Sequence, residues 1–264
     1  MPTIKGLRRR GFTPESINNF CADISVTRAT QTTIDWSRLE HFARMHLALI
    51  APRAFAVLDP VRLVLRNKAE DFFTVLKAPL FPKDPSKGMR SLPYQRVLYV
   101  DREDVRTKDE PKFLGLAPGK VVSLKYADVV RCDEVVCNGD TITQVNCSVL
   151  PEADAMSAIR QLDKKLGSIH WLAGDQLGEK PRTGEVRLYD KLFSVKNPSA
   201  EKDWEKSINP KSEVVIHNAM LETVLLGKRW EDHVQFERIG YFSVDRDSTK
   251  DHIVWNRTCG LKSI

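Results

Sequence analysis

The feature that most limits the folds open to this chain is a change of pattern near residue 58. Beyond it come short β-branched runs bounded by turn residues, with few positions at a helical period. We expect strands at 61–65, 97–100, 121–124, 129–130, 135–136, 141–145, 169–172, 185–193, 214–216, 234–244 and 253–255. Asn138-Gly139-Asp140 predicts a hairpin, and the four prolines of 79–93 predict a loop or extended connector. Such short strands favour barrels or sandwiches.

The first 58 residues have the pattern of short helices. Thr13 followed by Pro14 is typical of a helix start, and Asp35 can cap a second helix that Pro52 ends or kinks. The expected buried positions are Ile17, Phe20, Cys21 and Ile24 in one helix, and Leu39, Phe42, Ala43, Leu49 and Ile50 in the other. We therefore predict two or three helices before the strands begin.

Composition indicates a soluble globular protein, with 42% hydrophobic and 29% charged residues among 264. No run approaches the roughly 20 apolar residues of a membrane helix, and no apolar signal segment precedes Arg8. We therefore expect neither a membrane nor a secreted protein. Five cysteines without a C-x-x-C pair indicate reduced thiols, without disulfides or zinc.

The positive charge is concentrated near the start of the chain. Residues 1–70 carry 11 Lys and Arg against 6 Asp and Glu, whereas the whole chain has a net charge of +6. A polyanion partner, contacted most strongly by the N-terminal quarter, is one interpretation. The alternative is a solvated basic face without a partner.

No catalytic motif is present. The sequence lacks the phosphate-binding loop G-x-x-x-x-G-K-[ST], the pattern G-x-G-x-x-G and the zinc motif H-E-x-x-H. His170 is expected to be a core histidine, and Asp101, Glu103 and Asp104 a charged surface turn. We therefore predict no catalytic residue and no metal ligand in this chain.

Basic and amide side chains suit RNA instead. Arg8, Arg9 and Arg10 precede a capped helix, where guanidinium groups and a helix N-terminus both attract phosphate. Arg53 follows Pro52 and has small neighbours, so that its guanidinium group can reach the edge of a base. The alternatives are an exposed basic turn for the three arginines and an interdomain salt bridge for Arg53.

The run 234–244 carries a second base-reading candidate. Val234, Phe236, Phe242 and Val244 would share one face of a strand, and Gln235 would lie on the other. A glutamine amide both donates and accepts, as the reading of an unstacked base requires. Alternation puts Arg238 opposite Gln235, so both reach one ligand only through a bulge, for which Gly240 is the candidate.

Several motifs together resemble the glutaminyl-tRNA synthetase family of class I. The segments that carry the resemblance run in order from residue 2 to about 262: Gly6-Leu-Arg-Arg-Arg-Gly11-Phe-Thr-Pro14, Ala51-Pro-Arg-Ala-Phe-Ala-Val-Leu-Asp-Pro60, Ile169-His-Trp171, Glu185-Val-Arg-Leu-Tyr-Asp-Lys-Leu-Phe193, Gln235-Phe-Glu-Arg-Ile-Gly-Tyr-Phe-Ser-Val-Asp245 and Val254-Trp-Asn-Arg-Thr258. The related glutamyl-tRNA synthetases share the architecture, but the string 235–245 looks glutaminyl.

The resemblance implies a mainly β fold with an N-terminal helical subdomain and two anticodon-binding β-barrels of a type also found in ribosomal proteins. Residues 1–58 would form the helical subdomain, 59–110 with 196–264 the proximal barrel, and 111–195 the distal barrel. The family's Rossmann catalytic domain, with its HIGH-type and KMSKS-type motifs, would lie upstream, and neither motif occurs here.

The resemblance also assigns roles by position. Arg53 and Gln235 match residues that read the middle anticodon base, a uridine, and Arg238 matches another residue of that pocket. In the family, a pair of basic residues contacts a neighbouring anticodon base. The matching positions here are near Leu114 and Gly115, which are not basic, so the resemblance leaves the nearby Lys112, Lys120 and Lys125 as substitutes. Arg8, Arg9 and Arg10 would face the inner corner of the tRNA.

The expected partner is therefore glutamine tRNA, with the catalytic domain or a multisynthetase assembly as further partners, in the cytoplasm and away from membranes. The resemblance gives ATP and Mg²⁺ to the full-length enzyme and implies no cofactor bound by this chain. Two alternatives stay open: a stand-alone module that binds structured RNA without ligase activity, and a protein-interaction scaffold.

Overall fold

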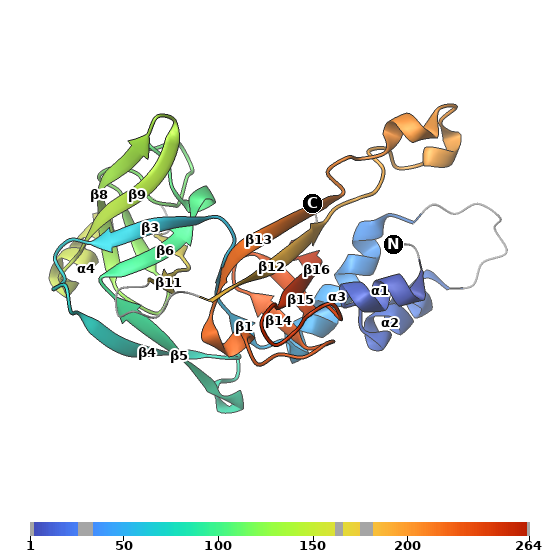
Figure 1. The fold of residues 1–264 in the computed structure, drawn as a ribbon, viewed down its shortest axis with the longest axis horizontal. Helices are drawn as coiled ribbons and strands as arrows, with labels where there is room; N and C mark the ends of the chain where they lie inside the picture. Colours follow the sequence, from blue (N-terminus) through green and yellow to red (C-terminus); the bar gives the residue numbers. More distant parts are fainter. Residues whose placement is uncertain (1–2, 26–33, 162–165, 175–181, 263–264) are drawn as a thin grey trace. The chain divides into compact units, whose positions relative to one another are not determined.

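The computed structural model describes residues 3–25, 34–161, 166–174 and 182–262 (Figure 1). The chain divides into two compact units, each built from separate stretches of sequence. The first comprises residues 1–54, 184–217 and 227–264, and the second residues 55–183 and 218–226.

Three helices open the first unit, and local sequence explains their ends. α1 (Ile4–Arg10) is capped by Thr3 and ends at Gly11, whose φ of 98° lies in the left-handed region that glycine favours. α2 (Pro14–Ile24) begins with the expected Thr13 cap, and α3 (Trp36–Ile50) with the expected Asp35 cap, 2.9 Å from the Ser37 amide.

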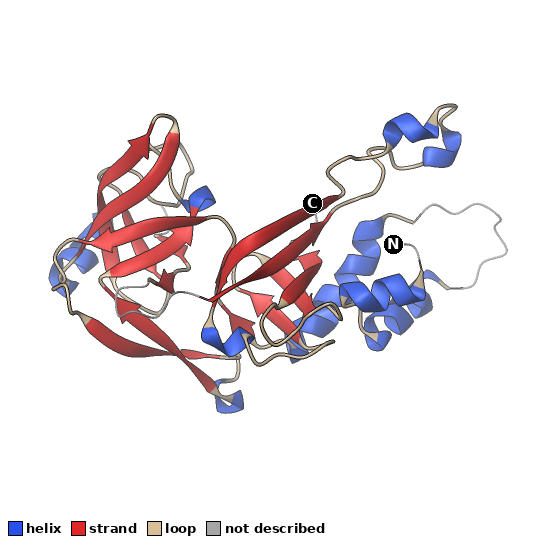
Figure 2. Cartoon of the chain, in the orientation of Figure 1, coloured by secondary structure: helices blue, strands red, loops and turns tan. Residues whose placement is uncertain are grey.

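A half-barrel completes the first unit, in a sheet with strand order β1-β14-β15-β16-β12-β13-β2 (Figures 1 and 2). These strands are β1 (Arg53–Ala54), β14 (His233–Phe236), β15 (Gly240–Val244), β16 (Val254–Gly260), β12 (Arg182–Tyr189), β13 (Glu213–Leu221) and β2 (Ala56–Val57). The last strand of this sheet and the end of β13 that pairs with it belong to the second unit. Phe236 and Phe242 stack at 4.1 Å, and Trp255 meets Phe236 edge-on. Short 3₁₀ helices lie at Pro198–Ala200 and Trp204–Ser207.

The second unit contains a near-closed barrel with strand order β10-β7-β8-β9-β3-β6-β11. Its strands are β3 (Pro60–Leu65), β6 (Val97–Asp101), β7 (Val121–Leu124), β8 (Val129–Asn138), β9 (Thr141–Val149), β10 (Gly167–Ile169) and β11 (Leu172–Ala173). Alternate residues such as Leu63 and Leu65 fill its interior. The unit also holds β2 (Ala56–Val57), β4 (Phe73–Pro79), β5 (Met89–Gln95), α4 (Glu152–Gln161) and 3₁₀ helices at Pro85–Lys87, Arg102–Asp104 and Thr223–Leu225.

The expected fold class is confirmed: the structure is mainly β with N-terminal helices, one near-closed barrel and one half-barrel. In the second unit, β3 and β6 belong to the same sheet as β7, β8, β9, β10 and β11. The three-part division with boundaries at residues 58, 110 and 195 stays a prediction.

Some local expectations were wrong for identifiable reasons. The proline-rich segment 79–93 forms the expected loop only over 80–88, and its remainder belongs to the antiparallel hairpin of β4 and β5, in which Pro93 pairs with Val75 at an edge that proline tolerates. In α3 the buried stripe is Leu39, Ala43 and Leu47, a four-residue spacing that leaves Leu49 69% exposed. Cys21 is likewise exposed.

Candidate nucleic-acid interface

Arg53 and Gln235 are brought together by the backbone. β1 runs parallel to β14 with Arg53 directly opposite Gln235. The backbone N–H of Gln235 donates to the Pro52 carbonyl at 2.9 Å, and the backbone N–H of Glu237 donates to the Ala54 carbonyl at 3.0 Å. Two residues 182 positions apart in sequence are thus fixed side by side, as the sequence interpretation required.

The two side chains also contact each other. Arg53 Nε donates to Gln235 Oε1 at 3.1 Å, with Gln235 only 8% exposed and Arg53 half-buried. In the part of the chain that the structure describes, this is the one side-chain hydrogen bond of Arg53. The terminal Nη groups and the glutamine Nε2 are therefore donors that a ligand can use.

Arg238 lies in a turn and not in a strand. The expected strand 234–244 is in fact the hairpin of β14 and β15, because Phe236 pairs with Gly240 and residues 237–239 reverse the chain. Arg238 is exposed and has a φ of 70°. Strand alternation therefore does not apply to Arg238. The irregular register lies between Tyr241 and Phe242, not at the expected Gly240.

Gly240 has a different role from the expected bulge. A Cβ atom at this position would lie 2.7 Å from the Cys259 carbonyl oxygen. Glycine therefore lets the hairpin close against β16 without a steric clash.

The three consecutive arginines occupy the last turn of α1, and each meets the protein itself. Arg9 donates to Asp245 with both Nε and Nη2 at 2.9 Å, and to Asp247 at 2.5 Å. Burial would raise the pKa of Asp245, but hydrogen bonds from Arg9, the Asp247 amide and Asn256 lower it to about 2. This makes Arg9 a structural residue that fixes α1 to the end of β15.

Arg8 and Arg10 differ in exposure. The Arg8 side chain is 62% exposed, pairs with Glu231 and lies 5.1 Å from the Trp230 ring centroid. Arg10 is 7% exposed, donates to the Arg257 carbonyl at 3.1 Å and lies over the Trp36 ring. Burial lowers the pKa of Arg10, and Glu40 acts in the opposite direction. The contact of Arg10 with an RNA backbone stays a prediction.

The three candidate lysines all belong to the second unit. Lys112 is exposed with a φ of 71°. Lys120 Nζ contacts the Asp109 carboxylate and the Phe113 carbonyl, and Lys125 Nζ lies 5.3 Å from the Tyr126 ring centroid. Lys112 is thus the most accessible of the three.

One cluster was wrongly interpreted from sequence. Asp101 and Asp104 are buried, not exposed in a surface turn. Asp101 accepts hydrogen bonds from the backbone N–H groups of Leu58 and Asp59, and its carboxylate lies 2.8 Å from His170 Nε2. Asp101 thus holds the segment that leads into β3. Only the core position of His170 was foreseen.

The described residues contain no group of three or more His, Cys, Asp or Glu placed to hold a metal ion. Among the described helices, none is long and apolar enough to cross a membrane.

Comparison with known proteins shows which family the sequence matches. Two family models, both described as the anticodon-binding domain of class I tRNA synthetases (E and Q), match residues 51–150 and 168–245. A probable glutamine–tRNA ligase of Dictyostelium discoideum is 41% identical over 99% of this chain and 32% of its own length. The cytoplasmic glutamine–tRNA ligase of Arabidopsis thaliana is 39% identical over 98% of this chain and 32% of its own length. The glutamine–tRNA ligase of Vibrio parahaemolyticus is 41% identical over 99% of this chain and 46% of its own length. The chain belongs to the class I glutaminyl-tRNA synthetase family.

Within that family it is an anticodon-binding portion, and it spans about a third to just under half of these relatives. The matched ranges contain Arg53 and the three lysines in one model, and Gln235 and Arg238 in the other. Arg8, Arg9 and Arg10 precede both ranges. The residues that the structure places side by side, Arg53 and Gln235, thus fall in the ranges of two separately matched anticodon-binding domain models.

Proposed function

We propose that this chain binds the anticodon arm of glutamine tRNA and reads its middle base, a uridine, with Arg53 and Gln235. The observation that carries the proposal is their backbone-enforced pairing, in which guanidinium and amide donors have no hydrogen-bond partner among the described residues. Gln235 is nearly buried, so only a base turned out of its stack can reach it.

Hydrogen-bond chemistry favours uridine over cytidine at such a site. Uridine presents carbonyl acceptors on both sides of its N3–H, which suit the Nη donors of Arg53 and the amide of Gln235. Gln235 Oε1 has a second lone pair for the N3–H beside its bond to Arg53. Cytidine presents an amino donor where uridine has O4, and two facing donors cost the desolvation of both. A bidentate contact of this kind is worth about 1 to 3 kcal/mol of discrimination.

Arg238 and the lysines have supporting roles in this proposal. Arg238 is exposed in the turn directly after β14, within three residues of Gln235, and would contact the nucleotide that Gln235 binds. Lys112 would contact a flanking nucleotide, with Lys120 and Lys125 secondary because their ammonium groups already meet the protein. Phosphate contacts of Arg8 would hold the RNA without reading its sequence.

In a protein that also carries the family's catalytic domain, this recognition would serve the ATP- and Mg²⁺-dependent attachment of glutamine to its tRNA. The residues named here bind and orient RNA. We propose no chemical step for them.

Binding of a labelled anticodon-arm hairpin tests the proposal. The chain should bind a hairpin with uridine in the middle position about fivefold or more tighter than one with cytidine there. About 6 phosphate contacts should weaken binding of either hairpin roughly 10³-fold between 50 and 200 mM salt. Equal affinity for the two hairpins would refute base reading, and binding without salt dependence would refute the RNA partner.

A further inference from the structure

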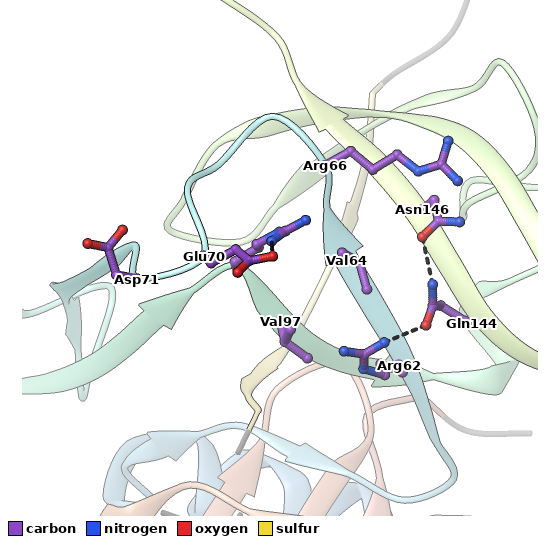
Figure 3. Close-up of a pocket in the computed structure, with 9 residues that line it drawn as sticks. Arg62, Val64, Arg66, Glu70, Asp71, Val97, Gln144 and Asn146 are labelled. Atoms are coloured by element: carbon purple, nitrogen blue, oxygen red, sulfur yellow. Dashed lines mark hydrogen bonds and ion pairs between the residues drawn. The ribbon is translucent and has the colours of Figure 1, made fainter. Parts of the chain in front are cut away.

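The outer face of the barrel in the second unit carries a groove of about 800 Å³. Its polar walls are formed by three arginines, Arg62, Arg66 and Arg96, and by two amides, Gln144 and Asn146 (Figure 3). Strand geometry explains the position of these residues. On β3, Leu63 and Leu65 point into the core, so Arg62 and Val64 lie on the outer face, with Arg66 directly after the strand.

The neighbouring strands extend this polar face. β9 pairs in parallel with β3 so that Arg62 lies opposite Gln144, and Val64 opposite Asn146. β6 pairs on the other side, with Arg62 opposite Tyr99 and Val64 opposite Val97. The groove therefore has an apolar floor at the two valines and polar groups along its length.

A continuous row of hydrogen bonds orders these side chains. Arg62 Nη1 donates to Gln144 Oε1 at 2.6 Å, and Gln144 Nε2 donates to Asn146 Oδ1 at 2.8 Å (Figure 3). Asn146 Nδ2 then donates to Glu134 at 2.9 Å, and Arg66 Nη2 donates to the same carboxylate at 2.5 Å. The row holds Arg62 and Arg66 in place at its two ends.

The charges along this row are only loosely neutralised. Among the described residues, Arg62 has no carboxylate partner, and a neutral amide positions it. Arg66 pairs with Glu134, and Arg96 pairs at 3.0 Å with Glu70, which is 91% exposed. Exposed pairs of this kind contribute about 0 to 1 kcal/mol. An incoming anion can therefore replace these carboxylates at little cost.

We propose that this groove binds a segment of single-stranded RNA, with its phosphodiester groups on Arg62, Arg66 and Arg96. The inference rests on the proposed RNA partner and adds a contact surface separate from the reading of the middle anticodon base. The mixed chemistry favours a nucleotide over an acidic peptide, because the groove also presents acceptors. The amide oxygens and the carboxylates of Glu70 and Asp71 suit ribose hydroxyls and base amino groups, which an acidic peptide lacks.

The size of the groove and its place on a barrel face agree with this ligand. Ligand-binding clefts commonly measure about 300 to 1,000 Å³, and small barrels bind oligonucleotides on an outer strand face.

The test compares two charge reversals in the whole chain. Arg62→Glu changes the groove, whereas Arg131→Glu makes the same change of charge at an exposed arginine of β8 that does not line it. Binding of a fluorescently labelled anticodon-arm hairpin and of a 12-nucleotide single strand is measured by anisotropy across a salt series. Arg62→Glu should weaken binding about fivefold to tenfold and reduce the salt slope by about 0.7 to 0.9, while Arg131→Glu changes affinity less than twofold.

Further variants keep the result interpretable. Arg62→Gln retains a partner for Gln144 without the charge and should reproduce most of the loss, and Arg62→Lys should restore part of the affinity. Equal losses for Arg62→Glu and Arg131→Glu would overturn the inference, since only overall charge would then matter. Poly-glutamate that binds more tightly than either RNA, in an Arg62-dependent manner, would also overturn it by assigning the groove to an acidic protein.

The two proposals fail in different ways. Arg62→Glu should leave the preference for uridine over cytidine unchanged, because Arg62 takes no part in reading that base. If the unaltered chain shows no such preference, the base-reading proposal fails. The groove is then judged by the difference between Arg62→Glu and Arg131→Glu alone.

Discussion

Arg53 and Arg9 lie in the same compact unit and look alike in sequence, yet the structure uses them differently. Arg9 meets the carboxylate of Asp245, whose side chain is fully buried, and the partly exposed carboxylate of Asp247. Arg53 meets the neutral amide of Gln235. The difference shows that both the charge and the burial of its partner decide whether an arginine is available to a ligand.

The physical reason is the strength of the two kinds of hydrogen bond. A bidentate guanidinium–carboxylate contact is charge-assisted and roughly twice as strong as a neutral one, and it neutralises the arginine. A single bond to an amide leaves the positive charge and the terminal donors of Arg53 available. Arg9 therefore stabilises the fold, whereas Arg53 can bind an anion or a base.

The largest expected effect follows from removal of the Asp245 carboxylate. Asp245→Ala should lower the free energy of unfolding by about 3 kcal/mol, because it leaves Arg9 without its buried partner. Urea unfolding followed by circular dichroism measures the change. Asp247→Ala is the matched control, and because its side chain is 46% exposed it should cost less than about 1 kcal/mol. Equal losses for the two variants would contradict the structural role of Arg9.

Arg53→Ala should produce the opposite pattern. We expect a loss of about 1 to 3 kcal/mol in the discrimination between uridine and cytidine at the middle anticodon position, because the Nη donors are removed. The free energy of unfolding should change little, since within the described residues the Arg53 side chain has a single neutral hydrogen bond to lose. Hairpin binding measured by anisotropy tests the first point, and urea unfolding the second.

The control for Arg53→Ala is Arg9→Ala. It should weaken binding of both hairpins alike, through loss of structure at α1. If Arg53→Ala and Arg9→Ala lowered affinity identically for both hairpins, Arg53 would have no base-reading role.

The buried contact of Arg9 with Asp245 should also make stability depend on pH. The folded-state pKa of Asp245 is about 2, below the ordinary value of 3.8, so the native state binds fewer protons than the unfolded state. The stabilisation is therefore present above about pH 4 and is lost as the pH falls towards 2. It amounts to about 2 kcal/mol, because each unit of pKa difference is worth about 1.4 kcal/mol.

An Asp245→Asn variant isolates this contribution from that of other carboxylates. Hydrogen bonds and charge from Arg187 outweigh burial and lower the pKa of Glu185, so acid destabilises the protein through Glu185 in the same direction. Urea midpoints between pH 6 and 2.5 should therefore fall for both proteins, but less steeply for Asp245→Asn. Parallel curves would show that Asp245 is not the titrating group.

Sequence reasoning located helix ends and barrel strands well, because these depend on local chemistry. Thr13 and Asp35 cap helices as expected, and the Asn138-Gly139-Asp140 turn joins β8 to β9. The hairpin at 237–239 was missed because nothing in Glu237-Arg238-Ile239 resembles a turn signal. Arg238 adopts a left-handed conformation, with a φ of 70°, at a turn position where glycine or asparagine is the usual residue.

The candidate site was foreseen in its members but not in its geometry. The motifs indicated Arg53 and Gln235, yet their contact depends on a parallel pairing of strands far apart in sequence, which no local pattern contains. The same limit applies to Arg10, whose burial against Trp36 could not be distinguished in sequence from the exposure of Arg8. Which arginine meets a carboxylate is decided by tertiary contacts.

Arg8→Ala gives the smallest expected effect and completes the comparison. The Arg8 side chain is 62% exposed and its partner Glu231 is also accessible, so the urea midpoint should not change measurably. If Arg8 is the member of the three that reaches a phosphate, its removal should weaken both hairpins equally, about twofold to threefold, with a shallower salt slope. Arg10→Ala should instead lower the urea midpoint, because Arg10 is buried among aromatic rings. A loss of uridine preference in Arg8→Ala would place base reading at α1 and contradict its assignment to Arg53.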